Sequence, residues 1–235
     1  CTERPSDNFM ETAKGTTYNL CVRTYSTKDT VLLTLNPHKD DDGVKADGVL
    51  PTYAGKKVHD HDKKYFKYGT IEQAECNAHT CRYLKEIDEL TKHEWPMKMA
   101  TLLLNILKHK ERDIDNNLFA MEDESFKRYS DEYDQILQMG KREIGTLNPK
   151  SIIRQKEQNL LDRLEQYKYN HLLFAKDYTA PFSNNQAERD FRWIKTHQKV
   201  SGCHRSYHGA ETIIRLMSFT RTLKKRRIPI IYGLK

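Results

Sequence analysis

The spacing of apolar and polar residues predicts strands near the start of the chain. Residues 18–25 and 30–35 are rich in β-branched and aromatic side chains, and a polar turn separates them. These two segments predict an antiparallel hairpin. After an aspartate-rich stretch and the turn-forming residues that follow it, residues 56–60 predict a further short strand, with Asp60 at its C-terminal tip.

From about residue 75 onward, the spacing changes to that of helices. Apolar residues recur in steps of three over 78–87, and those of 100–107 fit one helical face. Residues 126–144 and 151–177 keep this pattern on either side of a break at 145–149. These two segments predict an αα-hairpin.

Two more helices are expected near the C-terminus. One begins after Pro181, and the other carries Ile213, Ile214, Leu216 and Met217 after a loop at 201–209. Strands first and helices afterwards are typical of an α/β chain, or of an α+β chain with segregated layers. The chain has 235 residues, 37% of them hydrophobic, so we expect one domain with an insertion.

The net charge favours a polyanionic partner. The formal charge is +7, and many of the bases lie in the last fifty or so residues, including the run RTLKKRR at 221–227. Positive charge attracts a phosphate backbone regardless of its sequence. A basic surface is also a common aid to solubility, and the run at 221–227 fits either a DNA-backbone contact or a solvated helix end.

The cysteines and the apolar runs bear on the compartment. Five cysteines, an odd number without the dense spacing of a disulfide scaffold, predict free thiols in a reducing compartment. The apolar runs are far shorter than the ~20 residues of a membrane helix, so no membrane partner is expected. The sequence starts at Cys1 without an export signal, and we interpret it as a piece of a longer reading frame.

Two groups of polar residues are candidates for metal binding. ValHisAspHisAsp at 58–62 brings two acids and two imidazoles to a predicted strand end, where oxygen ligands for a divalent ion are often displayed, although an exposed polar turn would look the same. Cys76 and His79 share a helical face, as half of a zinc site would require. Cys203 and His204 would have to supply the other half, and a structural or hydrogen-bonding pair is the more common explanation.

Glu188 is the third candidate. It lies in AsnAsnGlnAlaGluArg at 184–189, and its spacing from Asn185 is also that of a capping box at a helix start. Nearby, Phe191 and Trp193 have the spacing of aromatic residues in a core, and only an exposed Trp193 would favour base stacking.

Three motifs follow one another along the chain: GKKVHDHDKKYFKYG, AECNAHTCRYLKEI and, after a long helical stretch, PFSNNQAERDFRWIKTHQKVSG. In this order they resemble the catalytic region of insertion sequence 66 type transposases, from about residue 18 to the C-terminus. The resemblance implies an α/β, ribonuclease-H-like fold, in which helices flank a mixed sheet. It divides the chain into a first part of the catalytic domain at 1–83, an all-helical insertion at 84–180, and the C-terminal catalytic helices at 181–235.

The resemblance also implies a catalytic triad of Asp, Asp and Glu that binds divalent metal. Asp60 matches the second Asp and Glu188 matches the Glu. The implied cofactor is Mg²⁺ or Mn²⁺, as two ions, and the implied partner is DNA, both transposon ends and target. A homo-oligomer on DNA and a bacterial-type cytoplasm, close to the nucleoid, are the expected setting for strand cleavage and strand transfer.

The first Asp of the triad is where this sequence departs from the pattern. Cys1 and Thr2 fit the tail of an Asp-x-Thr motif, in which case the acid precedes the chain. Asp7 is the other candidate, although no threonine stands two places after it. A chain without this acid is expected to be inactive, so a transposase remnant that only binds DNA is the alternative function, and another ribonuclease-H-like nuclease is a third.

Further residues are expected to order the active site or to contact DNA. Cys76 and His79 match a Cys-x-x-His motif of the family, two asparagines would cap the helix of Glu188, and nearby bases would neutralise phosphates. The full set is Cys76, His79, Arg82, Asn184, Asn185, Arg189, Arg192, Lys195, Lys199 and Arg205.

Overall fold

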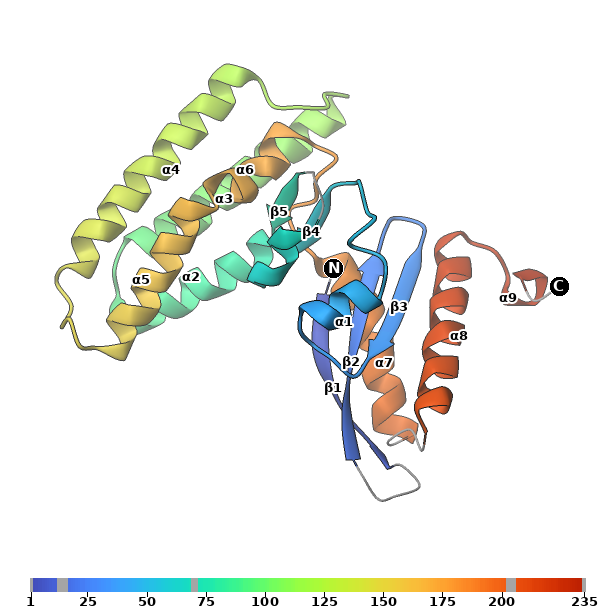
Figure 1. Cartoon of the computed structure of the whole chain (residues 1–235). Coiled ribbons are helices and arrows are strands. Elements are labelled where there is room, and N and C mark those ends of the chain that lie inside the picture. Colours follow the sequence, from blue (N-terminus) through green and yellow to red (C-terminus); the bar gives the residue numbers. More distant parts are fainter. Residues whose placement is uncertain (1, 12–16, 69–71, 202–205, 234–235) are drawn as a thin grey trace. The chain divides into compact units, whose positions relative to one another are not determined.

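The protein is described from a computed structural model that covers residues 2–11, 17–68, 72–201 and 206–233, with the backbone alone for 2–11, 17–19, 198 and 201. The chain divides into two compact units, whose positions relative to one another are not determined (Figure 1). The sheet unit comprises Cys1–Gly55, Asp62–Ile71 and Asn184–Lys235. The helical unit comprises Lys56–His61 and Glu72–Ser183.

The sheet unit contains an antiparallel sheet in the order β1-β2-β3. Its elements are β1 (Thr2–Glu11), β2 (Thr17–Ser26), β3 (Val31–Asn36), α1 (Asp41–Ala46), the 3₁₀ helix η1 (Lys63–Lys67), α7 (Asn185–Ser201), α8 (Tyr207–Lys225) and α9 (Ile230–Gly233). The predicted hairpin is confirmed, because β2 and β3 pair antiparallel with Val22 opposite Leu35. The two predicted C-terminal helices are confirmed as α7 and α8.

Helices α7 and α8 cover one face of this sheet (Figure 1). Side chains alternate between the two faces of a strand, so one set of positions on β2 and β3 meets these helices. The shared core consists of Val22, Val31, Leu33, Phe191, Ile194 and Ile214. Phe191 is only 4% exposed, so the prediction that it belongs to the core is confirmed.

The other set of β2 positions faces a second, smaller core made by Tyr25, Val44, Leu50, Tyr65 and Tyr68. Helix α1 contributes to it and was not predicted, because six residues are too few to show helical spacing. Asp40 caps α1 by accepting hydrogen bonds from the backbone of Asp42 and Gly43. Only glycine fits at position 43, because a Cβ atom there would lie 1.9 Å from the carbonyl oxygen of His38.

The helical unit holds a two-stranded parallel sheet and five helices. The elements are β4 (Lys57–His59), β5 (Gln73–Glu75), α2 (Asn77–Thr91), α3 (Trp95–Asp115), α4 (Asp123–Ile144), α5 (Ile152–Gln166) and α6 (Lys168–Lys176). The predicted strand at 56–60 and the αα-hairpin of α4 and α5 are confirmed. The single helix expected at 151–177 is wrong, because Tyr167, with φ of −110°, separates α5 from α6.

The core of the helical unit is built from the apolar faces of all five helices. Trp95, Leu103, Ile106, Tyr133 and Leu161 are among its completely buried members. The indole nitrogen of Trp95 donates a 2.6 Å hydrogen bond to buried Glu157, which also lies 2.8 Å from Nδ1 of His93. The buried carboxylate of Glu157 thus links α5 to the start of α3 and to the loop before it.

The predicted mixed α/β class is confirmed in its coarse form: the chain is mostly helical, 64%, with small sheets. Among the residues that the structure covers, no helix combines the length and the apolar character needed to cross a bilayer.

Candidate functional site

Glu188 lies in the first turn of α7 in the sheet unit. The backbone N–H of Glu188 donates a 3.2 Å hydrogen bond to the carbonyl of Asn184, which is the first hydrogen bond of the helix. Asn184 therefore occupies the N-cap position, and Glu188 lies one residue beyond the position that a capping-box acid takes. This geometry argues against a capping box between Asn185 and Glu188, and it leaves the half-buried carboxylate near the positive end of the helix dipole.

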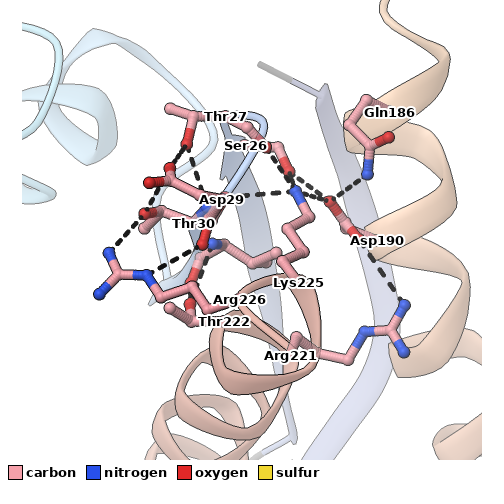
Figure 2. Close-up of polar contacts among 11 residues, drawn as sticks. Ser26, Thr27, Asp29, Thr30, Gln186, Asp190, Arg221, Thr222, Lys225 and Arg226 are labelled. Atoms are coloured by element: carbon pink, nitrogen blue, oxygen red, sulfur yellow. Dashed lines mark hydrogen bonds and ion pairs between the residues drawn. The ribbon is translucent and has the colours of Figure 1, made fainter. Parts of the chain in front are cut away.

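A buried acid two residues further on holds α7 in place. Asp190 is 3% exposed and lies 2.7 Å from the ammonium of Lys225 and 3.6 Å from the guanidinium of Arg221, both on α8. Ser26, at the end of β2, and Gln186 also donate hydrogen bonds to it (Figure 2). Burial alone would raise the pKa of Asp190, but the hydrogen bonds from its partners lower the pKa below its usual value.

The expected DNA-contacting residues of α7 point to solvent. Asn184 is buried at the helix start, whereas Asn185, Arg189, Arg192, Lys195 and Lys199 are exposed. Their exposure follows from the helical period, because Ala187, Asp190, Phe191 and Ile194 occupy the face toward the sheet.

Asp60 follows β4 directly, at the C-terminal tip of the parallel pair in the helical unit. The pairing continues beyond the strand ends, because the N–H of Cys76 donates a 3.0 Å hydrogen bond to the carbonyl of His59. His61, the residue after Asp60, has a positive φ of 32°, a conformation rare outside glycine. The chain thus turns sharply just behind Asp60, and Asp60 itself is half-buried.

Cys76 and His79 meet at the start of α2. Cys76 is the N-cap residue, and its sulfur lies 3.2 Å from Nδ1 of His79. Both are buried, so they make the hydrogen-bonding pair that was the more common explanation for their spacing. Arg82, one turn further along, is exposed, and its Nε donates a 3.3 Å hydrogen bond to the carbonyl of Ala78.

A charged pair behind β4 and β5 supports this tip. Glu75, the last residue of β5, is completely buried and accepts hydrogen bonds of 3.0 and 3.2 Å from Arg163 of α5. Nδ1 of His61 lies 2.7 Å from the same carboxylate. Burial alone would raise the pKa of Glu75, but its hydrogen bond with His61, together with neighbouring His171 and Arg163, lowers the pKa to about 2.

The surrounding imidazoles are kept neutral. Burial lowers the pKa of His59 to about 4 and that of His171 to about 3. His171, on α6, exchanges hydrogen bonds with Asn77 of α2: Nδ1 lies 3.0 Å from the side-chain oxygen, and the amide donates 2.9 Å to the His171 carbonyl. The tip of β4 is therefore held by α2, α5 and α6 together.

Several of the predicted site residues lie in segments whose side chains are outside the described atoms. Asp7 is on β1, between Pro5 and Phe9, where the register with β2 shifts, and its side chain is outside the described atoms. Cys203, His204 and Arg205 lie outside the described residues. In the described part of the chain, no three His, Cys, Asp or Glu side chains are grouped so that they could hold a metal ion.

The structure gathers Asp60, Cys76 and His79 in the helical unit, and Glu188 with the exposed bases in the sheet unit. It sets no distance between the two carboxylates, because they belong to different units. Four supporting residues were missed from the sequence: Glu75, Arg163, His171 and Asp190. Asp190 carries one signal, an acid on an otherwise apolar helix face, and Glu75, Arg163 and His171 carry none.

The family model described as the transposase IS66 family matches residues 10–212. No curated protein and no solved structure gives a match. The matched segment contains both Asp60 and Glu188 and most of both units, and a transposase is a protein that binds DNA and cuts it. The chain belongs to the IS66 family of transposases.

Proposed function

We propose that this chain is the catalytic region of a DDE transposase, which cleaves DNA strands at transposon ends and transfers them to target DNA. The observation that carries the proposal is the family match over residues 10–212, which includes Asp60 at a strand tip and Glu188 in the first turn of a helix. Both acids are half-buried, and each lies at the end of an element rather than inside a core.

In this proposal the catalytic domain has a ribonuclease-H-like fold, with the first part at 1–83, the helical insertion at 84–180 and the last catalytic helices at 181–235. An antiparallel sheet and a parallel strand pair are the two kinds of pairing that a mixed sheet requires, and both occur in the chain. The core of five helices agrees with an insertion that folds around its own apolar interior.

The donor chemistry of the motif residues fits a hard divalent cation. Mg²⁺ and Mn²⁺ prefer carboxylate oxygens, and Asp60 and Glu188 would hold them together with a third acid. That acid is Asp7 or the residue that precedes Cys1. When bound, a pair of such ions would stabilise charge on the attacking and leaving oxygens of a phosphoryl transfer.

The chain's own residues have distinct tasks in this proposal. Asp190 and its partners Lys225 and Ser26 fix the helix that presents Glu188. The Glu75–Arg163 pair holds His61 and thereby the turn behind Asp60. The exposed bases of α7 neutralise DNA phosphates as the backbone approaches, and two copies of the chain on DNA would bring two transposon ends together.

The test is nicking of supercoiled DNA in Mg²⁺ or Mn²⁺. Asp60→Asn and Glu188→Gln keep the side-chain shape and remove the charge, so each is expected to lower the nicking rate at least a hundredfold. Glu211→Gln, which changes an acid of α8 paired with exposed Arg215, is the matched control and should keep full activity. The proposal would be refuted if the wild-type protein nicks DNA and Glu188→Gln nicks it equally fast.

The first acid is assigned in the same assay. Loss of activity in Asp7→Asn identifies Asp7 as the third carboxylate. A wild-type chain that binds DNA but neither nicks it nor binds Mg²⁺ by calorimetry would instead be the DNA-binding remnant.

A further inference from the structure

Trp193 is an exposed aromatic residue of α7. It is 49% exposed, although Phe191, two positions earlier, is 4% exposed and Ile194, the next residue, is 2% exposed. Trp95, in the helical unit, is completely buried. A single exposed apolar side chain is common on a protein surface, so the groups around this ring decide whether it has a role.

Cations from the neighbouring helix surround this ring. The guanidinium of Arg221 lies 4.7 Å from the ring centroid and the ammonium of Lys224 lies 5.8 Å from it, both over the ring. The guanidinium of Arg221 also lies 3.6 Å from buried Asp190, and this ion pair helps to fix its position (Figure 2). Arg189, which is exposed, precedes Trp193 by four residues and therefore lies on the same side of α7.

Acids are few on this surface. The exposed bases of the two helices are Arg189, Arg192, Lys195, Lys199, Arg215 and Lys224. Of their acids, Glu188 is half-buried in the first turn of α7, Asp190 is buried under its partners and Glu211 is paired with Arg215. A half-exposed aromatic ring among cations does not resemble a protein-binding surface, whose centre is apolar and poor in charge. It has the composition of a site that stacks a base and neutralises the phosphates on either side of it.

We propose that Trp193, flanked by Arg221, Lys224 and Arg189, stacks on an unpaired DNA base and forms a contact site for single-stranded DNA on α7 and α8. The base must be unpaired, because both faces of a base inside a duplex are covered by its neighbours. The site deepens the proposed function, since strand cleavage at a DNA end exposes unpaired bases, but it does not depend on the acids of the motif.

The experiment measures binding of a 12-nucleotide oligothymidylate in EDTA, where no cleavage takes place, by quenching of tryptophan fluorescence and by anisotropy of a dye on the DNA. Trp95 is buried, so stacking should quench the emission of Trp193 and leave that of Trp95. Trp193→Leu is expected to remove the quenching and to weaken single-strand binding about tenfold. Trp193→Phe keeps an aromatic face and should restore most of the affinity.

Two controls separate stacking from general attraction. Phe119→Leu replaces an aromatic residue that is 83% exposed in the helical unit and should bind the oligonucleotide as the wild type does. Lys224→Gln should retain the quenching and lower the slope of log K against log salt by about 0.7, the value for one phosphate contact on a single strand.

Unchanged single-strand affinity in Trp193→Leu would overturn the proposal. So would an equal loss of affinity for a closed circular duplex, because Trp193 would then contact the backbone. A folding defect is recognised separately, since it would lower the affinity of Trp193→Phe as much as that of Trp193→Leu.

If Glu188→Gln abolishes nicking while Trp193→Leu binds normally, this inference fails and the catalytic proposal stands. If Glu188→Gln nicks normally while Trp193→Leu binds weakly, the stacking site stands and the catalytic proposal fails.

Discussion

Each unit of the molecule holds one motif carboxylate at its surface and one buried acid behind it, but the two buried acids are anchored differently. In the sheet unit, Asp190 is held by a lysine, an arginine and a serine from α8 and β2. In the helical unit, Glu75 is held by an arginine and a histidine. A buried acid and a motif acid are the same type of residue in the sequence. Only the contacts of their side chains show which one anchors the fold.

The difference lies in how much apolar packing surrounds each acid. Asp190 joins α7, α8 and the end of β2, whose shared apolar core is small, so this carboxylate helps to fix the layer that carries Glu188. Glu75 joins β5, α5 and the turn at His61, and the large apolar core of its unit packs independently of it. We therefore expect the sheet unit to depend more strongly on its buried acid than the helical unit does.

Asp190→Ala should produce the larger loss. It would leave the ammonium of Lys225, whose side chain is 12% exposed, buried without its main counter-charge. Removing one partner of a buried ion pair typically costs about 3–5 kcal/mol, so the free energy of unfolding of the sheet unit should fall by about 3 kcal/mol. Hydrogen exchange should rise in α7 and α8 and stay unchanged in α3 and α4.

The matched control is Glu211→Ala, which removes the acid of an ion pair whose arginine is 77% exposed. Such pairs contribute about 0–1 kcal/mol, so exchange should scarcely change. A similar rise in exchange for both variants would show that Asp190 does not anchor the layer.

Glu75→Gln should have a smaller effect, confined to the other unit. The amide keeps the size of the side chain and one acceptor for Arg163, which is 24% exposed and can regain water. Hydrogen bonds to a charged group contribute about 1.5–3 kcal/mol, so we expect a loss of about 2 kcal/mol. Exchange should rise in β5, α2 and α5, and a larger loss than in Asp190→Ala would reverse the comparison.

The sequence predicted the elements whose side chains carry a long repeating pattern, such as β2, β3, α4 and α8. It missed β5 and α1, because three residues of QAE and six of an aspartate-rich stretch are too short to repeat. The motif acids were identified through the order of three motifs. Their supports were not, because Arg163 and His171 reach Glu75 and Asn77 across 88 and 94 residues, and spacing along the chain does not reveal such contacts.

The two aromatic residues of α7 differ in burial because of their spacing along the helix. Phe191 and Trp193 were expected to share the core, and this is confirmed for Phe191 alone. The expectation for Trp193 is wrong, since two residues along a helix span about 200° and place side chains on opposite faces. The helical period of α7 could therefore have predicted that Trp193 faces away from the core. It could not have predicted the cations over the ring, because they come from α8.

A further expected difference between the units shows only as the pH is lowered. His171 is completely buried with a pKa of about 3, whereas an exposed histidine in the unfolded chain titrates near 6.5. As the pH falls from 6.5 towards 3, the unfolded chain binds a proton that the fold excludes. The free energy of unfolding of the helical unit should then fall by about 1.4 kcal/mol per pH unit for this residue.

Asp190 should add nothing in the upper part of this window, because its pKa lies below the usual 3.8 and its stabilising charge is lost only at lower pH. His171→Gln removes the titrating group and retains an amide for Asn77, so its stability should depend less steeply on pH between 6.5 and 4. Urea unfolding followed by helical circular dichroism at several pH values measures the slopes. Parallel slopes for the wild type and His171→Gln would mean that His171 takes up its proton within the fold, and the difference between the two units would then rest on their buried acids alone.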